Sequence, residues 1–190
     1  GSHIAGIVWN NYTDLDTGVY AGIAPDAGIL SVRVLGTDGT GTYTDVIEGI
    51  QYVVANKDAF NIRVLNLSFS ALPQSFYWDD PINQAVMEAW RSGLVVVASA
   101  GNTGPDPMSI GVPGNVPYVI TVGAMTDNRT PLDASDDSVT SFSAAGPTID
   151  PGPGTMLITP GGKPASASTM PSLASPSSSS TQPGRPACTA

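Results

Sequence analysis

The chain has 190 residues, of which 41% are hydrophobic, and a formal net charge of -9 at pH 7. This length allows one domain with a sizeable core, and the composition is that of a globular protein. The seven basic residues are scattered, so the sequence excludes a nucleic-acid backbone as the partner. The longest apolar run, Leu94 to Ala98, is too short to span a membrane, and the single cysteine excludes an internal disulfide.

The composition changes near Asp150. The last 40 residues contain eight of the 17 prolines and no acidic or aromatic residue. A segment of this kind cannot bury enough apolar surface to offset the entropy of ordering it. We therefore expect a patterned domain over residues 1–147 and a Pro/Ser/Ala-rich tail over residues 148–190, which is either disordered or the product of a disturbed reading frame.

Strand-like and helix-like segments alternate within the patterned domain. In chain order, the pattern predicts a strand over 28–35, a helix over 44–57, a strand over 62–68, a helix beginning at Asp80, and strands over 94–100 and 118–124. Nearly continuous apolar strands that alternate with helices indicate a parallel sheet that is buried on both faces. Functional residues are then expected at the carboxyl ends of the strands, just after Leu35, Leu67 and Ala100.

The two helices have clear boundaries. In the first, apolar residues recur on one helical face over positions 46–54. The second is predicted from Asp80 followed by Pro81, which suits the first position of a helix, and it stops at Gly93.

Short motifs follow the predicted strands. They are Gly36–Tyr43 after the first strand, Asn66–Ser70 after the second, Ala98–Asn102 after the third, and later Pro113–Gly114, Val122–Ala124 and Phe142–Pro147. In this order and spacing, and with the opening Gly1–Gly6, these motifs resemble the subtilase family, the subtilisin-like serine proteases. The opening is similar to the end of that family's His-Gly-Thr-His-Val-Ala-Gly motif. Over residues 1 to about 147, the resemblance implies a three-layer α/β fold with a mainly parallel sheet, truncated at both ends.

The resemblance implies a secreted serine endopeptidase that acts on peptides or proteins through an acyl-enzyme, outside the cell or in its envelope. Asn102 corresponds to the side-chain donor of the oxyanion hole. Gly39, Thr40 and Gly41 are expected to hydrogen-bond an extended substrate by strand addition, and Ser68, Phe69 and Ser70 are expected to form the opposite wall of the cleft. The family usually has glycine at the place of Ser70, so we expect Ser70 to narrow the first specificity pocket.

The catalytic triad is incomplete in this sequence. The family carries Asp, His and Ser in that chain order, and the catalytic His would stand one position before Gly1. His3 matches the second His of the motif, which is not the base, and is interpreted as a packed helix residue. Ser172, in a Ser-Leu-Ala-Ser-Pro stretch, is either the nucleophile or a chance match, because Met170 and Pro171 replace the expected Gly-Thr. With no triad Asp or His, we expect this chain to be inactive.

Three alternatives accompany this interpretation. A chain that keeps the cleft but lacks the chemistry is a peptide-binding module. A nucleotide-binding α/β protein is disfavoured because no Gly-x-Gly-x-x-Gly is present and Asp38 would repel phosphate. No cofactor or metal is expected: Asp16-Thr17-Gly18 is interpreted as a surface turn, with a calcium loop as the alternative.

Overall fold

The computed structural model describes residues 2–16, 18, 22–126, 130 and 133–148, together with the backbone of 157–158. Its elements in chain order are α1 (Ser2–Trp9), α2 (Tyr43–Asn56), β1 (Val64–Leu67), α3 (Pro81–Arg91), β2 (Val95–Ser99), β3 (Ile120–Val122), β4 (Met125–Thr126), β5 (Ser138–Val139) and β6 (Leu157–Ile158). Both predicted helices and three of the four predicted strands are present, with shorter strands than expected.

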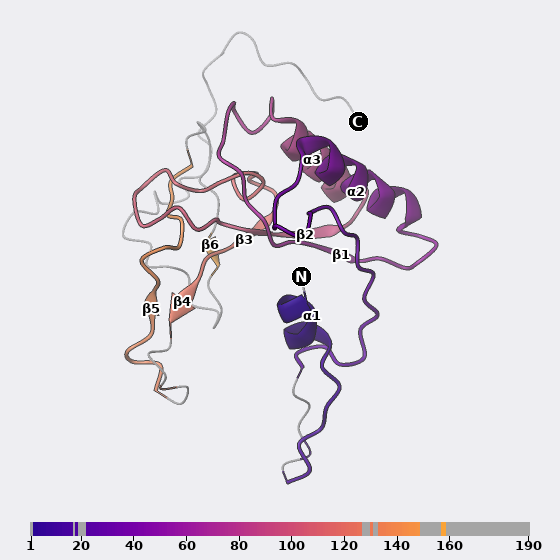
Figure 1. Cartoon of the computed structure of the whole chain (residues 1–190), viewed down its shortest axis with the longest axis vertical. Coiled ribbons are helices and arrows are strands. Elements are labelled where there is room, and N and C mark those ends of the chain that lie inside the picture. Colours follow the sequence, from indigo (N-terminus) through magenta and orange to yellow (C-terminus); the bar gives the residue numbers. More distant parts are fainter. Residues whose placement is uncertain are drawn as a thin grey trace, which may run out of the picture.

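The main sheet has the strand order β1-β2-β3-β6, and every neighbouring pair in it is parallel. A separate antiparallel pair joins β4 to β5. Helices α2 and α3 lie together on one side of the sheet, and α1 lies on the other side (Figure 1). This arrangement confirms the predicted α/β fold with a mainly parallel sheet.

Both sheet-covering helices begin with side chains that cap their first turn. Thr42 accepts a hydrogen bond from the backbone of Asp45, whose carboxylate accepts one from the backbone of Thr42 in return. Asp80 caps α3 and is followed by Pro81, as the sequence predicts. Gly93, just after α3, has a φ of 93°, a conformation that favours glycine and turns the chain into β2.

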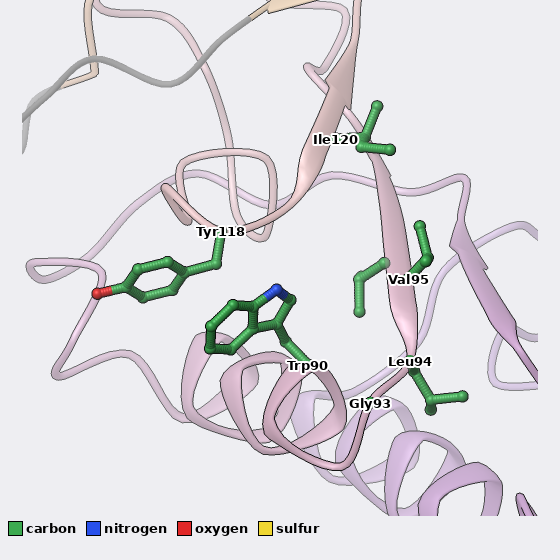
Figure 2. A pocket seen from close by; sticks show the side chains of 7 residues that line it. Trp90, Gly93, Leu94, Val95, Tyr118 and Ile120 are labelled. Carbon is green, nitrogen blue, oxygen red and sulfur yellow. The ribbon is translucent and has the colours of Figure 1, made fainter.

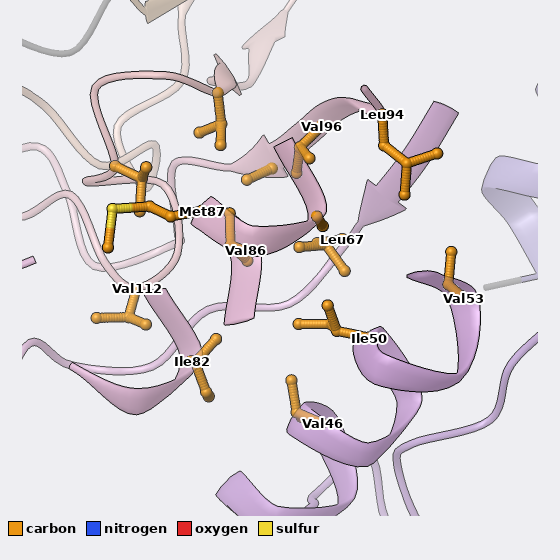
Figure 3. Packing of buried hydrophobic residues seen from close by; sticks show 14 residues of the cluster. Val46, Ile50, Val53, Leu67, Ile82, Val86, Met87, Leu94, Val96 and Val112 are labelled. Atoms are coloured by element: carbon orange, nitrogen blue, oxygen red, sulfur yellow. The ribbon is translucent and has the colours of Figure 1, made fainter. Parts of the chain in front are cut away.

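The core lies between the sheet and the two helices, as Figure 3 shows. Val46, Ile50 and Val53 of α2 form one side of it. Ile82 and Val86 of α3 are 2% and 0% exposed. These side chains meet the buried residues of β1 and β2, so α2 and α3 are packed onto the sheet by the apolar stripes that the sequence shows.

Among the described residues, no element packs closely over the opposite face of the sheet and side chains there are exposed, so the expectation that the strands are buried on both faces is wrong. Along β2, buried Val96 and Ala98 alternate with more exposed residues. Val95 remains 47% exposed and its neighbour Val64 in β1 remains 56% exposed. The reason is that α1, on this side of the sheet, buries none of its own residues. In the described part of the chain, only the face beneath α2 and α3 is covered.

The predicted strand over 28–35 is also wrong. The segment has strand-like composition, but no described backbone hydrogen bond joins it to another strand. Its side chains pack against the helices instead: Val34 and Val32 contact Gly49 of α2, where no side chain intervenes. A strand requires a partner backbone as well as apolar side chains. The residues of this segment are apolar because they are buried against α2, and not because they pair in the sheet.

The boundary predicted at residue 147 stays a prediction. Strand β6 lies beyond it and pairs with β3, so the sheet continues into the segment predicted as a tail. Apart from Thr148 and the β6 backbone, residues 148–190 lie outside the described residues. No helix within the described ranges is long and apolar enough to cross a membrane.

Candidate active site

The carboxyl ends of β1 and β2 place two predicted site segments side by side. These strands are parallel neighbours, with Leu67 opposite Ala98. Continuing this register by three residues places Ser70 opposite Gly101. The side chains confirm the meeting, because a Cβ built on Gly101 would lie 2.8 Å from Ser70 Oγ. The sheet therefore joins the Ser68–Ser70 segment to the segment that ends in Asn102.

Asn102 follows Gly101, whose backbone is fixed by hydrogen bonds. Gly101 is buried and has a φ of 106°, which only glycine adopts readily. Its backbone N–H donates to Ser99 Oγ at 3.1 Å, and its carbonyl accepts from the backbone N–H of Ala144 at 3.0 Å. Asn102 itself is exposed. An exposed amide on a fixed strand end can donate to a ligand oxygen in the adjoining space without reorganising the backbone.

A third segment, Gly111 and Val112, lies beside these two, and no motif found in the sequence includes it. The backbone N–H of Gly111 donates to the carbonyl of Ala100 at 3.0 Å, and Ala71 and Val112 exchange two hydrogen bonds of 2.9 Å. These bonds place Gly111 against Ser70. Gly111 is a lone glycine between apolar residues, which is the only sequence signal that marks it.

Ser68 and Phe69, the other two residues of the predicted wall, differ in how far they are buried. Ser68 is exposed, and its hydroxyl accepts a 2.7 Å hydrogen bond from the side-chain amide of Asn66. Phe69 is partly buried and packs against the main core. Ser68 and Ser70 are therefore the members of this wall that are open to a ligand.

The predicted strand-addition segment forms a tight turn. The backbone N–H of Gly36 donates to the carbonyl of Thr40 at 2.7 Å, and the backbone N–H of Thr40 donates to the carboxylate of Asp38 at 3.0 Å. Bonds from the backbone and hydroxyl of Thr40 hold the pKa of Asp38 below its usual value. The backbone N–H of Gly39 donates to the carbonyl of Gly36 at 3.1 Å. Because this N–H and both backbone groups of Thr40 are used within the turn, a substrate strand would bind here through the carbonyl of Gly39 and the backbone of Gly41.

The structure corrects the interpretation of His3. The residue lies in α1, as expected, but its side chain is exposed rather than packed. The helix α1 buries none of its residues, so no core is available there to receive the imidazole. Ser172 lies outside the described residues.

The Asp14–Asp16 segment is an exposed turn, in which the backbone N–H of Asp16 donates to the carboxylate of Asp14 at 2.9 Å. Within the described ranges, no group of three or more His, Cys, Asp or Glu side chains is placed to hold a metal ion. The calcium loop stays an untested alternative.

A pocket of about 370 Å³ lies away from these residues, at the amino ends of the strands. Figure 2 shows Trp90 and Tyr118 beside it, with Val95 and Ile120, the first residues of β2 and β3. The two aromatic rings stack with their centroids 5.0 Å apart. Because ligands of parallel sheets bind at the carboxyl ends, this pocket is not the candidate active site.

Comparison with known proteins identifies the family that this chain resembles. The model of the subtilase family matches residues 1–188. Serine protease AprX of Bacillus subtilis (strain 168) is 42% identical over 154 residues, which are 78% of this chain and 34% of AprX. Minor extracellular protease Vpr of the same organism is 35% identical over 145 residues, 76% of this chain and 16% of Vpr. The solved structure of Sphericase superposes with a TM-score of 0.61 at 26% identity, covering 74% of this chain and 43% of Sphericase. The chain thus spans about a third or less of the length of these two curated relatives.

Proposed function

The chain belongs to the subtilase family of serine proteases, and on this basis we propose that it forms the oxyanion and substrate-binding side of a peptide-hydrolysing cleft. The observation that carries the proposal is the position of Asn102. It is an exposed amide immediately after Gly101, which is fixed by bonds to Ser99 and Ala144 and touches Ser70. The whole protein is then an endopeptidase for peptide or protein substrates. An extracellular location is supported by the relative Vpr, whose name describes it as extracellular.

The proposed chemistry is acyl transfer. A serine hydroxyl attacks the scissile carbonyl, a base removes its proton, and the carbonyl oxygen becomes an oxyanion. The side-chain amide of Asn102 donates to that oxygen as the charge develops, so it stabilises the transition state more than the bound substrate. The exposed serines Ser68 and Ser70 face the peptide on one side, and the backbone of Gly39 and Gly41 pairs with it on the other.

Substitution of Asn102 in the whole protein tests this proposal. In Asn102→Leu, kcat for an activated peptide ester should fall by about 10²–10³, a magnitude known from a subtilisin rather than obtained from this structure, while KM changes little. Asn11→Leu is the matched control, because Asn11 is exposed in another part of the chain. A variant that raises KM and keeps its turnover number would contradict the assignment.

A peptide-binding module without catalysis is the second candidate. It is favoured by the exposed side chains of Ser68, Ser70 and Asn102 at adjoining strand ends, which offer polar groups to a peptide without needing a base. Labelling with a serine-directed phosphonate separates the two candidates, since only an activated serine nucleophile reacts with it. Labelling of the whole protein supports the protease, and peptide binding without labelling supports the module.

A further inference from the structure

Two buried asparagines join helix α3 to the loop that precedes β3. Asn83, in the first turn of α3, is 0% exposed, and Asn115, in the loop, is 1% exposed. The side-chain amide of Asn83 donates to the side-chain oxygen of Asn115 at 3.0 Å, across a separation of 32 positions in the sequence. Neither side chain takes part in the proposed chemistry, and neither is exposed to a substrate.

This polar pair does not improve the packing of the core. Asn83 Oδ1 is buried and accepts no hydrogen bond within the described part of the chain. Leaving a buried acceptor without a donor is unfavourable, whereas replacing both members of a buried polar pair by apolar groups of similar shape is nearly neutral or stabilising. Val112 and Val116 already anchor the loop in the main core. Because apolar packing has no preferred direction and a hydrogen bond has one, the asparagine pair adds orientation to this contact.

Further hydrogen bonds lead from the pair to the backbone that carries Asn102. The backbone N–H of Asn115 donates to the carbonyl of Gly111 at 3.0 Å. The backbone N–H of Gly111 in turn donates to the carbonyl of Ala100 at 3.0 Å. Ala100 is buried and stands two positions before Asn102. A rotation of the loop at Asn115 would therefore shift Gly111 and, through its bond, the position of Ala100.

Both sides of this connection are held in place. The backbone N–H of Asn83 donates to one carboxylate oxygen of Asp80 at 3.1 Å, and the other oxygen accepts from the hydroxyl of Tyr43. On the loop, the carbonyl of Gly114 accepts a 2.7 Å hydrogen bond from the buried hydroxyl of Thr121 in β3. The first turn of α3 is thus a fixed support, and the loop is tied to it and to β3.

We infer that Asn83 and Asn115 are positioning residues, which fix the place of the Asn102 side-chain amide before an oxyanion forms. The inference rests on the proposed function. Stabilisation of an oxyanion requires a donor that is already in place, about 2.7–3.1 Å from the developing charge. A displacement of about 1 Å, caused by a change far from the reacting atoms, can lower the rate about 10²-fold. A directional bond in the core prevents such a displacement without touching the substrate.

The test separates stability from turnover in the whole protein. The double variant Asn83→Leu/Asn115→Leu removes the unmatched acceptor together with the bond, so its free energy of unfolding should be unchanged or higher. Its kcat for an activated peptide ester should nevertheless fall by about 10–100-fold at nearly constant KM, because the donor acts mainly on the transition state. In the 190-residue chain, the same double variant should exchange the Gly111 amide hydrogen at least about 10-fold faster, since the loop opens more often.

Ile82→Val is the matched control. Ile82 is the buried neighbour of Asn83 on α3, so this variant should lose stability and keep its kcat. Asn83→Ala replaces the double variant if that does not fold, and should show the same fall in kcat. An equal fall in Ile82→Val would overturn the inference, because any change in the core beneath α3 would then lower turnover.

The remaining outcomes distinguish this inference from the proposed function. If the double variant keeps its kcat while Asn102→Leu loses turnover, the positioning role is overturned and the proposed function stands. If Asn102→Leu also keeps its kcat, the oxyanion role of Asn102 fails, and the positioning role fails with it. A Gly111 amide that exchanges as fast as an exposed amide in the unmodified 190-residue chain would show that the loop is not held, which also overturns the inference.

Discussion

The hydroxyl of Tyr43 donates a 3.1 Å hydrogen bond to the carboxylate of Asp80, which is 1% exposed. Tyr43 is the first residue of α2 and Asp80 caps α3, so the bond joins the amino ends of the two helices that cover the sheet. Burial of the phenol, and then the nearby charge of Asp80, raise the pKa of Tyr43 to about 12.

Removing this hydroxyl should destabilise the fold. In Tyr43→Phe, the free energy of unfolding should fall by about 1–3 kcal/mol, because one oxygen of a buried carboxylate loses its donor. Urea unfolding followed by circular dichroism measures the change. Tyr52→Phe is the matched control, since Tyr52 lies on the same helix and is 46% exposed. An equal loss in both variants would contradict a special role for the Tyr43–Asp80 bond.

The same bond predicts a loss of stability in alkali. An unfolded tyrosine releases its proton near its ordinary pKa of 10.0, whereas folded Tyr43 keeps it up to about 12. The unfolded state therefore binds fewer protons in this interval. The stabilisation that comes from protonated Tyr43 is fully present below pH 10.0 and is lost as the pH rises toward 12. Unfolding midpoints on either side of pH 10.0 measure this effect, and Tyr43→Phe should show a smaller decline than the unmodified chain.

Asp80 should contribute through its capping oxygen as well as its contact with Tyr43. One carboxylate oxygen accepts from the backbone N–H groups of Ile82 and Asn83, at 2.9 and 3.1 Å. Asp80→Ala should lower the free energy of unfolding by at least about 0.5–2 kcal/mol, and Asp80→Asn, which keeps a capping oxygen, by less. Thermal unfolding checks the order, with the exposed neighbour substitution Asp79→Ala as the control. An Asn variant as unstable as the Ala variant would show that capping is not the main effect.

Packing beneath α3 provides a further prediction. Ile82 is 2% exposed and belongs to the main core, so Ile82→Ala should cost about 2–5 kcal/mol in unfolding free energy. Ile23→Ala removes the same atoms from a side chain that is 84% exposed and should change stability by less than about 0.5 kcal/mol. Comparable losses would mean that the region around Ile23 also holds the fold together.

The 190-residue chain should show no peptidase activity. Its single histidine, His3, is exposed on α1, and a serine hydroxyl without a nearby base is a weak nucleophile. Hydrolysis of an activated peptide ester by the purified chain, beside its Asn102→Ala and Ser172→Ala variants, is the measurement. Turnover that disappears only in Ser172→Ala would overturn this prediction and identify Ser172 as the nucleophile.

Local features of the sequence determined the two core helices and pointed to Asn102 as the candidate functional residue. The capping side chains of Thr42 and Asp80 bond to backbone groups no more than three residues away, and the apolar stripes repeat at the helical period. Both features can therefore be predicted from the sequence without knowing the fold. Asn102 follows an apolar strand, and its proposed role comes from the resemblance of Ala100–Asn102 to the oxyanion-hole segment of the family. The fold class could be inferred from alternating strands and helices.

Only the tertiary structure decided which strand-like segments pair and which residues meet. Residues 28–35 have strand composition but find no partner backbone in the described chain, and Val95 and Val64 remain exposed because no described element packs over that face of the sheet. Ser70 meets Gly101 and Gly111 because the register of two parallel strands, and the loop bonded to them, brings together segments 31 and 41 positions away. The hydrogen bonds that hold Gly111 beside Ser70 join residues far apart in the sequence and leave no periodic pattern in it, and that is why Gly111 appeared as a neighbour of Ser70 only in the folded molecule.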